Sequence, residues 1–66
     1  MPRSTREWAK RKIDSADGNL TWVITHMDEV IGVYIDEHPD IALPLEQIKQ
    51  VCTELRNTLI QVRKTF

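Results

Sequence analysis

Cysteine and glycine are scarce in this sequence, and the scarcity of cysteine limits how the chain can be stabilised. The 66 residues include one Cys, two Gly and two His. One cysteine excludes an internal disulfide, and a lone cysteine with two separated histidines does not form a metal site of known spacing. A short chain without either device usually gains stability from a partner chain. We therefore expect self-association, with the chain itself as the first partner.

Long apolar runs and a strong net charge are also absent. No run approaches the ~20 apolar residues that cross a bilayer, and the N-terminus has no apolar signal-peptide core. These absences predict no membrane partner and a cytoplasmic location. The formal net charge is −1, so global charge does not indicate nucleic acid.

No stretch matches a catalytic, cofactor-binding or metal-binding motif. Adjacent carboxylates such as Asp28 and Glu29 fall on helix faces expected to be solvated, whereas general acid–base catalysis needs a carboxylate with a shifted pKa in a cleft. Cys52 lies in a predicted apolar seam without a neighbouring base. The sequence therefore predicts a protein that is not an enzyme, with no catalytic residue, no cofactor and no metal.

Apolar residues in two stretches are spaced alternately four and three residues apart, the pattern of a helix packed along one side. The first seam contains Ala9, Ile13, Ala16, Leu20, Val23, Met27, Val30 and Tyr34. The second contains Ile41, Leu45, Ile48, Cys52, Leu55, Leu59, Val62 and Phe66. Pro39 lies between them, and the residue before a proline disfavours helix. The pattern predicts an all-α antiparallel two-helix hairpin, one domain over 1–66, with a long helix at about 4–38 and a second at about 40–65.

The first predicted helix has one weak point, at Gly18. Asp17-Gly18-Asn19 is typical of a turn, and glycine costs about 1 kcal/mol in a helix interior. The apolar spacing nevertheless keeps its phase from Ala16 to Leu20, which favours a continuous helix. The alternative is a short first helix followed by a long one that Asp17 or Asn19 caps.

Further apolar residues flank the first seam and widen it. At 100° per residue the apolar arc spans roughly 200°, more than one neighbouring helix can cover. We therefore expect the first helix to be central, and two hairpins to pair into a dimeric four-helix bundle, with a higher oligomer as the alternative. The predicted self-association face consists of Trp8, Trp22, Ile24, Ile31 and Ile35.

Charge is strongly polarised along the chain. Residues 1–12 carry five cations and one anion, whereas residues 28–46 carry six anions and no Lys or Arg. The basic arm can bind phosphate groups, with Trp8 stacking on a base. Alternatively, its cations meet the acidic pole of a neighbouring subunit. The candidate phosphate or nucleic-acid contacts are Arg3, Arg6, Lys10, Arg11, Lys12, Arg63 and Lys64.

These patterns predict a small non-enzymatic helical interaction and assembly protein. It would act through an apolar self-association face and through its charged poles, which are available to a further protein partner. The alternative prediction is a small nucleic-acid- or nucleotide-binding protein that uses the basic N-terminal arm.

Overall fold

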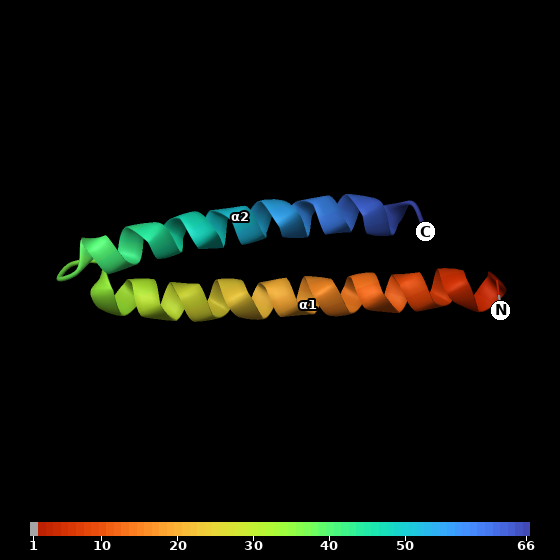
Figure 1. Ribbon diagram of the computed structural model, residues 1–66, viewed down its shortest axis with the longest axis horizontal. Helices are drawn as coiled ribbons and strands as arrows, with labels where there is room; N and C mark the ends of the chain where they lie inside the picture. The colour runs from red at the N-terminus through yellow and green to blue at the C-terminus, as the bar shows by residue number, and fades with distance from the viewer. Residues whose placement is uncertain (1) are drawn as a thin grey trace.

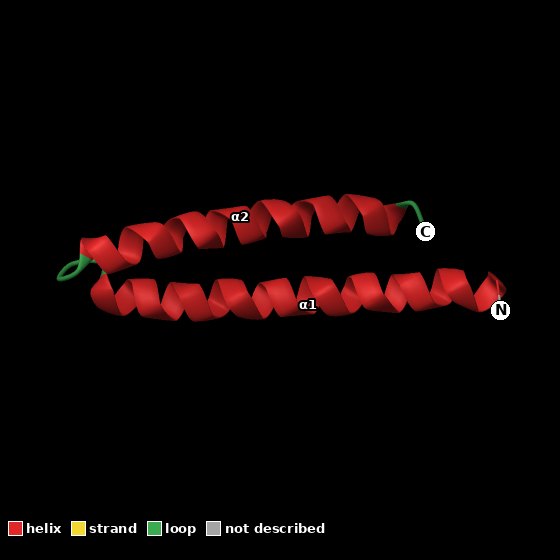
Figure 2. Ribbon diagram, in the orientation of Figure 1, coloured by secondary structure: helices red, strands yellow, loops and turns green. Residues whose placement is uncertain are grey.

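The protein is a slender rod of two antiparallel helices (Figures 1 and 2). The computed structural model describes residues 2–66, and side chains from Thr5 onward. Helix α1 spans Pro2–Tyr34 and helix α2 spans Pro39–Lys64. The rod measures 54 × 15 × 12 Å. The predicted all-α hairpin is therefore confirmed over the described residues.

The connection between the helices is short and begins earlier than predicted. α1 ends at Tyr34 rather than near residue 38. The amide of Ile35 donates to the carbonyl of Ile31 at 2.9 Å, and the amide of His38 donates to the carbonyl of Tyr34 at 2.7 Å. His38 has φ −136° and ψ 69°, a non-helical conformation that is usual before proline. Pro39 then opens α2, where its missing N–H costs nothing.

α1 runs without a break through Gly18, as the phase of the apolar pattern predicted. A methyl group built at Gly18 or at Gly32 would meet nothing within 4 Å. Neither glycine has a positive φ, so the backbone at these positions suits any residue. Both glycines are exposed, and each lowers the stability of α1 through its own conformational freedom.

Gly18→Ala is therefore expected to stabilise the protein by about 1 kcal/mol, because alanine is the better helix former and gains no clash. Urea unfolding followed by circular dichroism measures the change. Gly32→Ala is the matched control in the same helix and should give a similar gain. A loss of stability at Gly18 alone would contradict a continuous helix at this point.

The interior of the hairpin is very small. Ile31, at 6% exposure, and Ala42, at 0%, are the buried hydrophobic side chains among the described residues. The second predicted seam differs from the one observed: Leu45, Cys52 and Leu59 are partly buried, but the other five predicted members are exposed. Those five are Ile41, Ile48, Leu55, Val62 and Phe66. α2 is thus rotated relative to the prediction, and most of its larger apolar residues flank its contact with α1 instead of forming it.

Candidate self-association surface

Each helix has a central contact row of partly buried residues. In α1 this row contains Ile13, Leu20 and Met27, and in α2 it contains Leu45, Cys52 and Leu59. Residues four positions later in each helix lie about 40° to one side of the row, and residues four positions earlier lie about 40° to the other side. In an antiparallel helix pair, the rows four positions later in the two helices lie on the same side of the hairpin. The rows four positions earlier lie together on its other side. The hairpin therefore has two faces of different chemistry.

The first face, formed by residues at and beside the later offset, is an ion-pair face. Arg56 Nε donates to Asp17 Oδ1 at 2.7 Å, and Arg63 Nε donates to Asp14 Oδ1 at 2.9 Å. Lys49 forms a third interhelical pair with Asp28.

The cations on the ion-pair face also pack. The side chains of Lys49, Arg56 and Arg63 are only 31–40% exposed, because their aliphatic stems lie along the interface. Exposed pairs of this kind contribute at most about 1 kcal/mol each. Their main effect is to fix which side of α2 contacts α1.

The pKa of Lys49, on the ion-pair face, is raised. The hydrogen bond to Asp28 raises the pKa of Lys49 above its ordinary value, and the charges of Asp28 and Glu46 act in the same direction. Partial desolvation opposes the rise. The ammonium group therefore stays charged throughout the neutral range, and the pair with Asp28 persists there.

The second face is apolar and is open mainly along α2, because three of its four α1 residues, Ala9, Ala16 and Val30, are partly buried. We call it the open face and define it as the row of residues four positions before each contact row: Ala9, Ala16, Val23 and Val30 from α1, and Ile41, Ile48, Leu55 and Val62 from α2. The four α2 members are 40%, 47%, 51% and 42% exposed in that order. Ile48 and its neighbour Val51 also line a shallow groove with Pro44, Gln47 and Cys52. A stripe of this length is unusual on a monomer, where exposed apolar residues are normally scattered.

The predicted self-association residues are divided between the hairpin interior and the outside. Ile31 is buried against α2, and Ile24 is partly buried in the same row. Trp8, Trp22 and Ile35 are exposed. Trp22 stacks on His26, with ring centroids 5.5 Å apart. The five residues therefore do not form one continuous outer surface. The open face was missed because its α2 members were assigned to the hairpin seam.

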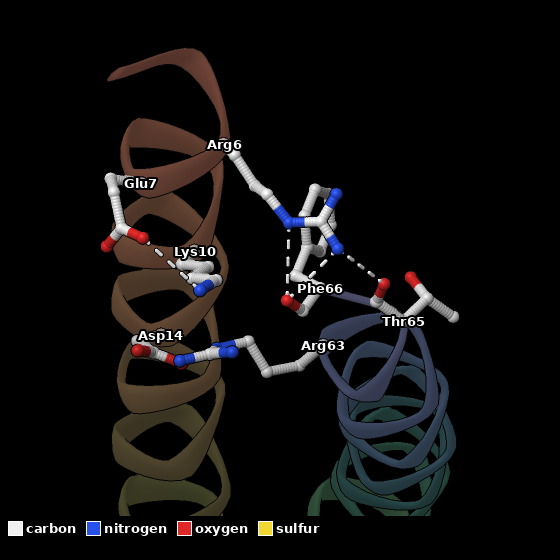
Figure 3. A network of polar contacts seen from close by, with 7 residues as sticks. All are labelled: Arg6, Glu7, Lys10, Asp14, Arg63, Thr65 and Phe66. Carbon is white, nitrogen blue, oxygen red and sulfur yellow. Dashed lines mark hydrogen bonds and ion pairs between the residues drawn. The ribbon is translucent and has the colours of Figure 1, made fainter. Parts of the chain in front are cut away.

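Several residues of the predicted basic arm have partners within the hairpin (Figure 3). Arg6 donates to the backbone carbonyls of Thr65 and Phe66, both at 3.1 Å from Nη2, and its guanidinium lies 5.4 Å from the Phe66 ring centroid. Lys10 pairs with Glu7 at 3.3 Å. Arg63 reaches Asp14 across the helices, as described above.

The other members of the arm are less constrained. Arg11, Lys12 and Lys64 are exposed, and the side chain of Arg3 lies outside the described residues. The structure does not gather the six described cations into one patch, because Arg6 and Arg63 are directed toward the other helix. Phosphate binding by this arm remains a prediction.

Arg6 joins the two helices at the end of the hairpin opposite the connection. Its planar guanidinium donates to the carbonyls of Thr65 and Phe66 and lies over the Phe66 ring. Arg6→Gln is expected to speed hydrogen exchange at the amides of Thr65 and Phe66 several-fold, since the end of α2 loses its contact with α1. Arg11→Gln is the control, because Arg11 is exposed on the same helix, and it should leave these rates unchanged. Equal rates in the wild type and Arg6→Gln would show that the contact does not hold the helix end.

Candidate metal ligands do not cluster in the described part of the chain. No group of three or more His, Cys, Asp or Glu residues there could hold a metal ion. The thiol of Cys52 is free and partly buried in the contact row. Neither described helix combines the length and the apolar character required to traverse a bilayer.

No protein-family model, curated protein or solved structure matches this chain. Any function proposed for the chain therefore rests on the residues of the hairpin itself.

Proposed function

We propose that the protein is a small non-enzymatic assembly module that forms a homodimeric four-helix bundle through its open face. The observation that carries this proposal is the continuous apolar row on α2, from Ile41 to Val62, on the side turned away from the ion pairs. A second copy that presents the same face would bury both rows in one core. This arrangement is isologous, as two-fold symmetry requires.

The surface area of the single hairpin supports the proposal. A compact monomer of 7.7 kDa is expected to expose about 4300 Å², whereas the hairpin exposes 5134 Å². The excess is close to the roughly 800 Å² that each partner buries in a standard specific interface. One hairpin has two buried side chains in its described part, which is too small a core for comfortable stability alone.

The shapes of the two rows also suit a bundle. The α1 row is built from small residues and the α2 row from larger ones. Small side chains let two helix backbones approach closely, and larger ones fill the remaining space at the density of a protein interior. The charged poles of the rod, outside this core, would then act on further partners or on the second copy.

The solution mass tests the proposal directly. Light scattering and sedimentation across a wide concentration range are expected to give twice the chain mass at high concentration, with dissociation on dilution. Helix content measured on the same samples should fall as the dimer dissociates, because each hairpin loses its main core. A well-folded monomer at all concentrations would overturn the proposal.

The alternative, nucleic-acid binding, has less support because Arg6 and Arg63 are directed to intramolecular partners. Binding of a labelled DNA or RNA oligonucleotide at low salt, lost steeply as salt is raised, would favour it.

A further inference from the structure

We infer that the two hairpins associate with their loops at opposite ends, so that α1 packs antiparallel against α1 of the second copy and α2 against α2. This inference rests on the proposed dimer and specifies its geometry. The other face-to-face arrangement places both loops at the same end and packs α1 against α2 of the partner. The two arrangements bury the same open face, so charge and residue spacing must decide between them.

The charges along α1 favour the antiparallel arrangement. The basic segment 3–12 and the acidic segment 28–37 lie at equal distances from residue 20. Antiparallel α1 helices that cross there bring each basic segment beside the partner's acidic one. In the described chain, Asp36, Glu37 and Asp40 have no ion pair within the hairpin. The arrangement with both loops at the same end would place these carboxylates next to their own copies, where like charges repel.

The small apolar residues of α1 have the same centre as its charges. Ala9 and Val30 lie at equal distances from the point between residues 19 and 20, and so do Ala16 and Val23. Two antiparallel copies that cross there place Ala9 beside the partner's Val30, and Ala16 beside the partner's Val23. Each contact then joins a smaller to a larger side chain. The apolar row and the charge pattern thus indicate one crossing point independently.

The α2 helices fit the same crossing point. The ion pair between Asp17 and Arg56 places Leu55 level with the middle of α1. Around that level, Leu55 lies beside its own copy, and Ile48 lies beside the partner's Val62. Three of the four open-face residues of α2 therefore meet other open-face residues in the register that the α1 pairing sets, and Ile41 lies beyond the end of the partner's α2.

Spin labels at two positions test the orientation. In a Cys52→Ala background, one variant carries a label at Glu37→Cys in the connection, and a second carries it at Asn19→Cys near the crossing point. Both native residues are exposed in the hairpin, and Asp36 and Asp40 keep acidic charge beside the label at Glu37→Cys. Pulsed dipolar spectroscopy then measures the distance between the labels in the two copies.

The antiparallel arrangement predicts about 50 Å between the Glu37 labels, because each lies some 17 residues from the crossing point at 1.5 Å per residue. It predicts less than about 20 Å between the Asn19 labels, since packed helices lie 8–10 Å apart. Short distances at both positions would overturn the orientation while leaving the dimer intact. No dipolar coupling at Asn19, with a monomer mass for the unlabelled chain, would overturn the dimer as well.

Ionic strength gives a second test of the same inference. If oppositely charged ends of the two hairpins meet, salt screens an attraction between them. The dimer dissociation constant should then rise several-fold between about 0.05 and about 0.5 M NaCl, one decade of ionic strength. If like poles meet, salt screens a repulsion and the constant should fall. Lys12→Glu in every chain should weaken the antiparallel dimer at low salt, and Lys64→Glu, at an exposed site away from the α1 contact, is the control.

Discussion

Leu55→Glu is expected to convert the dimer to a monomer at micromolar concentration. Leu55 is half-exposed in the hairpin and lies at the centre of the open face. Fully burying a leucine is worth about 1.5–3 kcal/mol, and about half of this remains to be gained at the interface because Leu55 is already half-buried, so the two copies together lose about 1.5–3 kcal/mol. At 1.4 kcal/mol per decade, the dissociation constant should rise roughly 10- to 100-fold from the lost apolar burial alone. Sedimentation equilibrium measures this shift.

Asn57→Glu is the matched control for Leu55→Glu. It introduces the same charge two residues further along α2, at an exposed position on the outer side of the helix. Its dissociation constant should stay within a few-fold of the wild type, because the carboxylate remains in water. If Leu55→Glu kept the wild-type mass, the open face would not be the interface. Circular dichroism at the same concentration should show the loss of helix that accompanies dissociation for Leu55→Glu, and no loss for Asn57→Glu.

Ile31→Ala is expected to have the largest effect on folding itself. Ile31 is 6% exposed and packs between the helices, so the truncation leaves a cavity as well as removing apolar contact. Such a change costs about 2–5 kcal/mol, whereas a chain of this length has about 3–10 kcal/mol of total stability. The variant should therefore lose about half of its stability. Urea unfolding at a fixed chain concentration measures the loss.

Ile31→Val and Thr25→Ala bracket this result. Ile31→Val removes a single methylene group and should cost about 0.5–1.5 kcal/mol. Thr25→Ala lies on the exposed side of α1 and should be neutral or slightly stabilising, because alanine is the better helix former. A small effect at Ile31 would mean that the residue is not the main interior contact of the hairpin.

The hairpin could be predicted from the sequence because apolar spacing and proline placement are local signals. The apolar spacing of three and four residues continues across Gly18, and helix α1 is continuous there as well. His38-Pro39 predicted the break, and α2 begins at Pro39. The end of α1 was less predictable, since the proline signal lies at Pro39, whereas α1 already ends at Tyr34 and residues 35–37 form a turn.

The side of α2 that contacts α1 could not be read from apolar residues alone. Leu45, Cys52 and Leu59 have neighbours on both flanks, and the more apolar flank contains Ile48 and Leu55. The hairpin uses the other flank because lysine and arginine stems cover apolar surface while their charges reach Asp14, Asp17 and Asp28. The signal was present: three cations, Lys49, Arg56 and Arg63, recur every seven residues opposite those three acids. This signal can be recognised only when the charges of the two helices are compared with each other.

Pro39 has a consequence for how two chains can exchange parts. Hairpins with short connections can open and trade a helix with a neighbour, and a continuous rod through the connection is the easiest swapped form. His38 cannot adopt helical geometry comfortably before a proline, and Pro39 removes the amide that would continue the ladder. The straightened rod is therefore disfavoured in every chain. In the proposed dimer, each copy is therefore expected to keep its own α2, so that whole hairpins associate rather than exchanged halves.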